Sequence, residues 1–150
     1  MPKPSCTRFE LTEIVERSDH DGARRMIVLD SVGVTKLSER SLDSLALLKK
    51  LRELDSLFIV PSVVLVESLH GNSPKDANTL RFLRTCVVEE ALTGGVAKRA
   101  AELRRLSGHG SVVDAVVIAF AEPGGTVVSG DRVDMARLAD RAHDVQVIDV

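Results

Sequence analysis

Four acidic residues stand at positions where a carboxylate needs a specific reason: Asp30, Glu67, Asp114 and Asp131. Asp30 ends the apolar run MIVLD and Asp131 directly follows TVVSG, whereas Glu67 and Asp114 interrupt apolar runs. Burying an unpaired, ionised carboxylate costs far more free energy than one apolar side chain returns. One shared cause explains all four, namely a hard divalent cation, Mg²⁺ or Mn²⁺, held by oxygen ligands. The residue types therefore predict a metal site built from these four carboxylates.

Three of these acids also have a structural explanation, which the sequence leaves open. Ser111 and Asp114 have the spacing of a capping box, in which each residue bonds the backbone of the other at the start of a helix. Asp131 can cap the helix that follows it, and Asp30 can begin a turn. Glu67 belongs to no first helical turn and follows the apolar residues VVLV, so we expect it to be a buried acid that needs a partner.

The pattern of apolar residues predicts the elements that must position these acids. Short apolar runs indicate buried parallel strands, and apolar residues at three- and four-residue spacing indicate amphipathic helices. The predicted strands are 26–30, 56–61, 87–91, 126–130 and 145–150, and the predicted helices are 41–54, 62–71, 73–85, 93–108, 111–125 and 132–142. This alternation predicts an α/β fold, a parallel β-sheet flanked by α-helices on both faces. Ligands of such sheets bind at the carboxyl ends of the strands, where Asp30 and Asp131 lie.

Length and composition set the expected organisation of the chain. One domain is expected for 150 residues, and the polar stretch 1–25 is predicted to be an N-terminal extension of the domain at 26–150. No apolar run reaches the ~20 residues of a membrane span, and the N-terminus lacks the apolar segment of a secretory signal. We therefore expect a cytoplasmic protein with no membrane partner. Cys6 and Cys86 form no CxxC pair, so we expect two thiols rather than zinc ligands.

Charge and aromatic content restrict how this chain can bind nucleic acid. The formal net charge is −2, so the protein as a whole does not attract polyanions. The absence of Trp and Tyr argues against base-stacking platforms, which leaves contacts to phosphate and metal. The basic residues of two predicted helices are candidates for phosphate contacts, with a solvated helix face as the alternative. They are Arg81, Arg84, Lys98, Arg99, Arg104 and Arg105.

Residues 26–150 resemble the PIN domain, and in particular the VapC-type toxins of bacterial toxin–antitoxin pairs. The resemblance rests on four segments in the same order, MIVLDS (26–31), VPSVVLVESLHG (60–71), VVDAVVIAFA (112–121) and VVSGDRVDMARLA (127–139). It implies a PIN-like fold with the acidic quartet of the family on Asp30, Glu67, Asp114 and Asp131. It also implies that Ser129 is the polar residue two positions before the last acid.

The resemblance implies an Mg²⁺- or Mn²⁺-dependent endoribonuclease that hydrolyses RNA phosphodiester bonds. It further implies a cognate antitoxin protein as partner and a homodimer. We hypothesise that three of the acids, Asp30, Asp114 and Asp131, bind the metal. Glu67 then binds a second metal ion or orients the attacking water.

Some positions depart from the pattern of the family. Val32 stands where the family often has Ser or Asn, and Ser111 stands where it often has a further acid. Asp134 is a second acid near Asp131 and an alternative fourth ligand. The four histidines share no metal-ligand spacing and are expected to be solvated or capping residues, with His70 the nearest cationic neighbour of Glu67 in the sequence. They are His20, His70, His109 and His143.

Two other functions compete with the nuclease. A non-catalytic PIN-like module that binds or regulates a partner fits the same fold, and Val32 is compatible with it. A phosphoryl-transfer domain with Asp30 as phosphoacceptor explains neither Glu67 nor Asp114. The helices predicted at 41–54 and 73–85 are candidate dimer or partner surfaces, with core packing as the alternative use of their apolar stripes.

Overall fold

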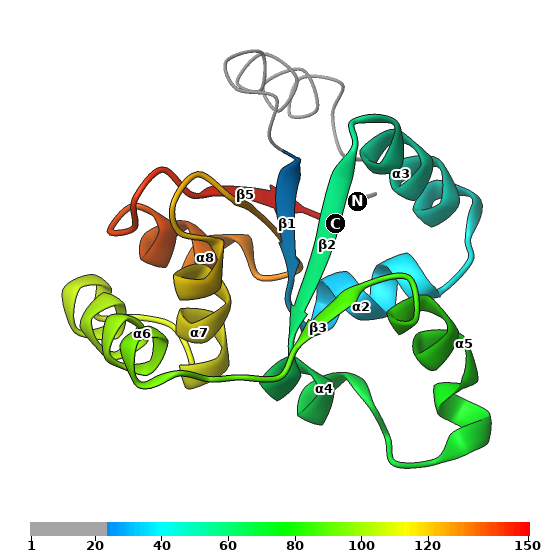
Figure 1. Ribbon diagram of the computed structural model, residues 1–150, viewed down its shortest axis with the longest axis horizontal. Coiled ribbons are helices and arrows are strands. Elements are labelled where there is room, and N and C mark those ends of the chain that lie inside the picture. The colour runs from blue at the N-terminus through cyan, green and yellow to red at the C-terminus, as the bar shows by residue number, and fades with distance from the viewer. Residues whose placement is uncertain (1–23) are drawn as a thin grey trace.

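The computed structural model describes residues 24–150 (Figure 1). The predicted extension 1–25 lies outside this part of the chain, except for Arg24 and for Arg25, which is the first residue of a strand. The strands are β1 (Arg25–Leu29), β2 (Ser56–Pro61), β3 (Val87–Glu89), β4 (Thr126–Ser129) and β5 (Gln146–Asp149). The helices are α2 (Ser31–Ser38), α3 (Leu42–Glu53), α4 (Ser62–Ser68), α5 (Ser73–Leu83), α6 (Gly94–Ser107), α7 (Val112–Ala121) and α8 (Arg132–Ala139).

The five strands form one parallel sheet in the order β3-β2-β1-β4-β5. The chain builds the sheet outward from β1 in one direction through β2 and β3, and then in the other direction through β4 and β5. The order therefore reverses between β1 and β4. In open α/β sheets a crevice opens at such a reversal, outside the carboxyl ends of the two strands. The fold class predicted from the sequence, a parallel sheet with helices on both faces, is confirmed.

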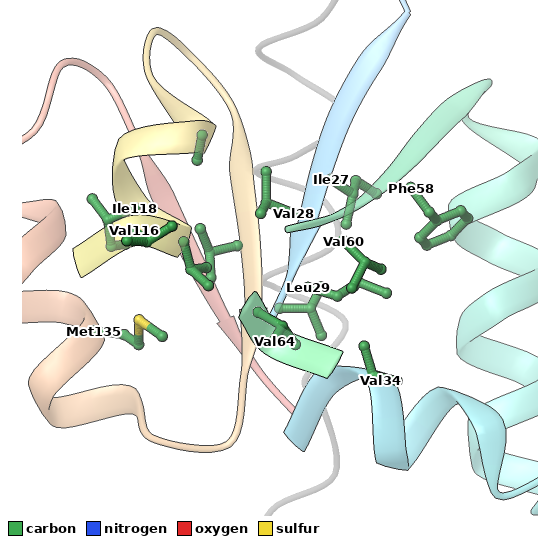
Figure 2. Packing of buried hydrophobic residues seen from close by; sticks show 14 of the residues in the cluster. Ile27, Val28, Leu29, Val34, Phe58, Val60, Val64, Val116, Ile118 and Met135 are labelled. Carbon is green, nitrogen blue, oxygen red and sulfur yellow. The ribbon is translucent and has the colours of Figure 1, made fainter. Parts of the chain in front are cut away.

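Helices cover both faces of this sheet (Figure 1). Helices α6, α7 and α8 lie on one side, and α2, α3 and α5 lie on the other. The core is apolar, and Val64 of α4, Val60 of β2 and Val34 of α2 are fully buried members of one cluster (Figure 2). Helix α4 therefore packs at the carboxyl end of β2, against α2.

The helices begin where short polar side chains can cap them. The hydroxyl groups of Ser41, Thr93 and Ser111 accept hydrogen bonds from the first-turn backbone of α3, α6 and α7. Helix α6 ends at Gly108 in the left-handed conformation, with φ of 67°, which glycine adopts without steric strain. Among the elements within residues 24–150, α2 is the one helix that the apolar pattern did not predict.

Two further sequence predictions concern membrane-spanning helices and the cysteines. None of the helices within residues 24–150 has the length and apolar character needed to cross a membrane. Cys86 is a free thiol, and burial raises its pKa to about 11, so it is protonated at neutral pH. The other cysteine that was expected to be a thiol, Cys6, lies outside the described residues.

Candidate active site at the carboxyl edge of the sheet

Asp30 occupies the reversal point of the sheet, directly after β1. Its side chain is 5% exposed and caps α2, with the backbone N–H of Gly33 donating to Oδ1 at 2.6 Å. Its other oxygen, Oδ2, accepts a hydrogen bond of 2.5 Å from the hydroxyl group of Ser129. Ser129 ends β4 and is fully buried, so this bond joins the ends of the two strands on either side of the reversal. Asp30 is thus fixed by both of its oxygens.

Asp131 joins the same arrangement through its backbone. Its N–H donates to Ser129 Oγ at 2.9 Å, so one hydroxyl group links Asp30 to the chain at Asp131. The Asp131 side chain is exposed and caps α8, accepting from the N–H of Asp134 at 3.3 Å. The interpretation of Asp131 as a helix cap is confirmed. Capping engages Oδ1 of this exposed carboxylate.

Asp114 is part of a complete capping box at the start of α7, as its spacing with Ser111 predicts. Its backbone N–H donates to Ser111 Oγ at 3.1 Å, and its Oδ2 accepts from the N–H of Ser111 at 2.9 Å. The capping role does not remove Asp114 from the site, because its negative charge acts on Asp30. The structure therefore brings two of the predicted carboxylates, Asp30 and Asp114, within electrostatic reach of each other.

The pKa of the Asp30 carboxyl is raised above its ordinary value of 3.8. Burial is the largest cause, because it disfavours the charged form, and the charge of Asp114 adds to it. The hydrogen bonds from Ser129 and Gly33 favour the charged form but do not outweigh burial. A buried carboxylate with an acidic neighbour is most stable when a proton or a cation balances its charge.

The exposure of the Glu67 side chain differs from the sequence prediction. We expected a buried acid, but the Glu67 side chain is exposed, because the seven-residue helix α4 turns it and Val66 away from the core. His70, its cationic neighbour in the sequence, is bound instead by Asp76.

The loop after α4 is held by a second buried aspartate, Asp76, which is 4% exposed. Its Oδ1 accepts from the backbone N–H of His70 at 2.9 Å, and its Oδ2 accepts from that of Asn72 at 3.0 Å. His70 Nδ1 lies 3.0 Å from Oδ1. These hydrogen bonds lower the pKa of Asp76 below 3.8, and the one from the His70 backbone has the largest effect. Asp76 thus anchors the end of the helix that carries Glu67.

Replacing Asp76 by asparagine is expected to lower the melting temperature, because the amide offers one acceptor where the carboxylate offers two. The lowered pKa means that the contribution of Asp76 to stability is fully present above pH 3.8 and is lost as the pH falls through the folded-state value below it. Thermal unfolding of the wild type and Asp76→Asn at pH 7 tests this, with the exposed Asp43→Asn as control. Equal melting temperatures for all three proteins would show that the loop is not anchored by Asp76.

Exposed valines accompany the four acids. Val32, Val66, Val112 and Val133 are 40%, 80%, 57% and 62% exposed, and each lies within two positions of one acid. Val32, which departs from the family pattern, packs tightly against Gly130. A β-carbon added to Gly130 would overlap the Val32 side chain. The mouth of the acidic centre is therefore partly apolar.

Sequence reasoning did not identify Gly33 as a site residue. A β-carbon at Gly33 would stand 2.5 Å from the backbone oxygen of Val128 and 3.3 Å from Asp30 Oδ1. Only glycine lets α2 approach β4 closely enough for its N–H to bind Asp30. The signal was present as D-x-x-G directly after a strand, which is the spacing of a helix cap and its third residue.

The basic residues divide into two kinds. Arg99 is held by Glu122 and Glu102, with its guanidinium 2.8 Å from an oxygen of each, so the interpretation of Arg99 as a free phosphate contact is wrong. The other candidates are exposed: Arg81, Arg84, Lys98, Arg104 and Arg105.

Within residues 24–150, no three side chains of His, Cys, Asp or Glu already stand in a metal-binding group. The donor set still suits Mg²⁺ or Mn²⁺, since it consists of carboxylates of which one is buried and near a second negative charge.

Comparisons with known proteins support the fold. No family model matches the chain, and no curated protein matches it. Among solved structures, the chain is similar to one in the crystal structure of VapBC2 from Rickettsia felis bound to a DNA fragment from their promoter. The TM-score is 0.62 at 14% sequence identity, and the match covers 83% of this chain and 98% of that chain. The α/β architecture that the motifs imply is therefore found in a VapBC2 complex.

Proposed function

We propose that this chain is a metal-dependent endoribonuclease, the toxin component of a toxin–antitoxin pair. The observation that carries the proposal is the buried carboxylate of Asp30 at the reversal point of the sheet, with the charge of Asp114 close to it. Such a pair is stabilised by a divalent cation, and the crevice at a reversal point is where α/β folds bind ligands. The VapBC2 name of the structural neighbour agrees with the VapC-like motifs.

Four side chains would hold Mg²⁺ or Mn²⁺: Asp30, Asp114, Asp131 and Glu67. Metal ions at such sites activate water and neutralise the charge that builds on phosphorus and on the leaving oxygen. The chain itself supplies the positioning. Ser129 and Gly33 orient both oxygens of Asp30, the capping box orients Asp114, and Glu67 and Asp131 contribute exposed carboxylates.

The substrate and partners follow from the same proposal. RNA is the proposed substrate, a cognate antitoxin the proposed protein partner, and a homodimer the proposed assembly. A partner that silences the enzyme has to cover an acidic centre rimmed by valines, which calls for a segment that is both basic and apolar.

The test separates the charge of Asp114 from its capping role. Asp114→Asn keeps an oxygen that can accept from the Ser111 N–H, but it removes the negative charge. Ser111→Ala removes the cap, at a cost of about 1 kcal/mol, and keeps the carboxylate. A mixed RNA pool is incubated with Mn²⁺, with Mg²⁺ or with EDTA. We expect metal-dependent cleavage by the wild type and by Ser111→Ala, and a loss of at least about 100-fold in Asp114→Asn.

Two outcomes contradict the proposal. If folded wild-type protein free of partner cuts no RNA with either metal, the chain is a non-catalytic binding module. If Ser111→Ala loses as much activity as Asp114→Asn, the role of Asp114 is to cap α7. Circular dichroism of each variant establishes that the compared proteins are folded.

A further inference from the structure

A basic hollow lies beside the acidic centre, at the junction of α6 and α7. It has a volume of about 450 Å³, within the usual range of ligand sites. Its lining consists of Ala101, Arg104, Arg105, Gly108, His109 and Gly110. Two arginines, one histidine and two glycines without side chains leave a concave surface with hydrogen-bond donors and little bulk.

The arginines of this hollow are free to bind a ligand. Arg104 and Arg105 are exposed, and within residues 24–150 no acidic side chain forms an ion pair with either of them. Arg99, on the same helix, differs from them, because it forms ion pairs with Glu102 and Glu122. Helix α6 therefore carries a structural arginine in its first half and unpaired arginines in its last turn.

A third arginine approaches the hollow from another helix. Arg137 of α8 places Nη1 2.8 Å from Nε2 of His109. Because arginine has only donors, His109 Nε2 is the acceptor of this hydrogen bond. Arg137 also forms no ion pair with an acid of the described chain. The hydrogen bond fixes a cationic group against the loop that forms one wall.

The wall of the hollow continues directly into the acidic centre. Gly110 is followed by Ser111, whose N–H donates to Asp114 Oδ2 at 2.9 Å. A polyanion whose scissile phosphate lies at Asp114 would therefore pass a neighbouring phosphate along this wall. Arginine is suited to this contact, because its planar guanidinium donates two parallel hydrogen bonds to phosphate oxygens.

We propose that this hollow binds the phosphodiester backbone of the RNA strand next to the bond that is cut. The proposal rests on the proposed nuclease function and adds a substrate-binding subsite to it. Contacts of this kind position the strand without reading its sequence. They also make up for the net negative charge of the chain by concentrating positive charge at the place where the strand enters.

Binding of a fluorescein-labelled single-stranded RNA tests the subsite. It is measured by fluorescence anisotropy in EDTA, over a series of salt concentrations, so that no cleavage occurs. We expect the double variant Arg104→Ala/Arg105→Ala to bind roughly tenfold more weakly than the wild type. The slope of log affinity against log salt should become shallower by about 1.4, which is about 0.7 for each of two lost phosphate contacts. The control Lys50→Ala/Lys75→Ala, which removes the same charge from exposed positions on α3 and α5, should change neither quantity.

The outcomes separate this proposal from the nuclease proposal. Unchanged RNA affinity in Arg104→Ala/Arg105→Ala, or an equal loss in the Lys50→Ala/Lys75→Ala control, would overturn the subsite, even if the wild type cuts RNA with Mn²⁺. The expected loss of affinity together with no cleavage under any metal would retain the subsite and refute the nuclease. Melting temperatures of both double variants, expected within a degree or two of the wild type, exclude unfolding as the cause.

Discussion

Asp30→Asn is expected to abolish RNA cleavage and, in metal-free buffer at pH 7, to raise the melting temperature. Asparagine resembles the neutral form of the acid. Its oxygen can accept from the Gly33 N–H as the cap of α2, and its amide can donate to Ser129 Oγ. The variant therefore keeps the hydrogen-bonding positions, and it removes a buried charge together with its repulsion from Asp114. Each kcal/mol gained corresponds to roughly 4 °C for a domain of this length.

The pH dependence of this effect has a definite sign. Because the folded-state pKa of Asp30 is raised, the folded protein binds more protons than the unfolded chain between pH 3.8 and that raised value. The charged acid is therefore a destabilising group at neutral pH, and this penalty is relieved as the pH falls through the folded-state pKa. Melting temperatures of the wild type and Asp30→Asn from pH 7 to pH 4 should accordingly converge. The opposite sign is expected at Asp76, whose pKa is lowered.

A contrary result would be equally informative. If Asp30→Asn melts below the wild type across the whole pH range, then the hydrogen bonds from Ser129 and Gly33 outweigh the burial of the charge. Asp30 would then be a structural cap. Cleavage that survives the substitution would remove Asp30 from the proposed metal ligands.

Gly33→Ala is expected to destabilise the fold and to disturb the acidic centre at the same time. The added carbon would meet the Val128 backbone oxygen at 2.5 Å, and backbone cannot turn aside as a flexible side chain can. Helix α2 has to move away from β4, which also draws the Gly33 N–H away from Asp30. We expect a loss of about 1–3 kcal/mol, the usual range for overpacking, and a loss of cleavage beyond what the unfolded fraction explains.

Chemical denaturation of Gly33→Ala against Gly95→Ala measures this effect. Gly95 lies in the first turn of α6, where an added carbon meets nothing closer than Thr93 Oγ1 at 3.9 Å. Alanine there should be neutral or stabilising by up to about 1 kcal/mol, because alanine favours helix more than glycine does. If both variants unfold at the same denaturant concentration, the close approach of α2 to β4 is not rigid.

The sequence predicted most elements because their signals are local. The strands are short apolar runs, and Ser41, Thr93 and Ser111 have the residue types and positions of helix caps. Helix α2 was not predicted, because SVGVTKLS contains a glycine and three β-branched residues, which weaken the local helical signal. Contact with α4, α5 and the sheet stabilises α2 instead, and such contacts are not local.

The site was predicted less completely for the same reason. The carboxyl ends of the strands placed Asp30 and Asp131 at one edge, and the capping box of Asp114 followed from its spacing. The burial predicted for Glu67 was wrong, because an apolar run does not reveal which side of a short helix faces solvent. The partner of Arg99 was also beyond prediction, since Glu122 is 23 positions away in the chain.

The hydrogen bond between Ser129 and Asp30 joins residues 99 positions apart. During synthesis, Asp30 is therefore made 99 residues before its partner. A growing chain that has not yet released β4 lacks the strand that pairs with β1 on this side, so the crevice has only one wall. The acidic centre is therefore completed only after β4 has been synthesised and has paired with β1.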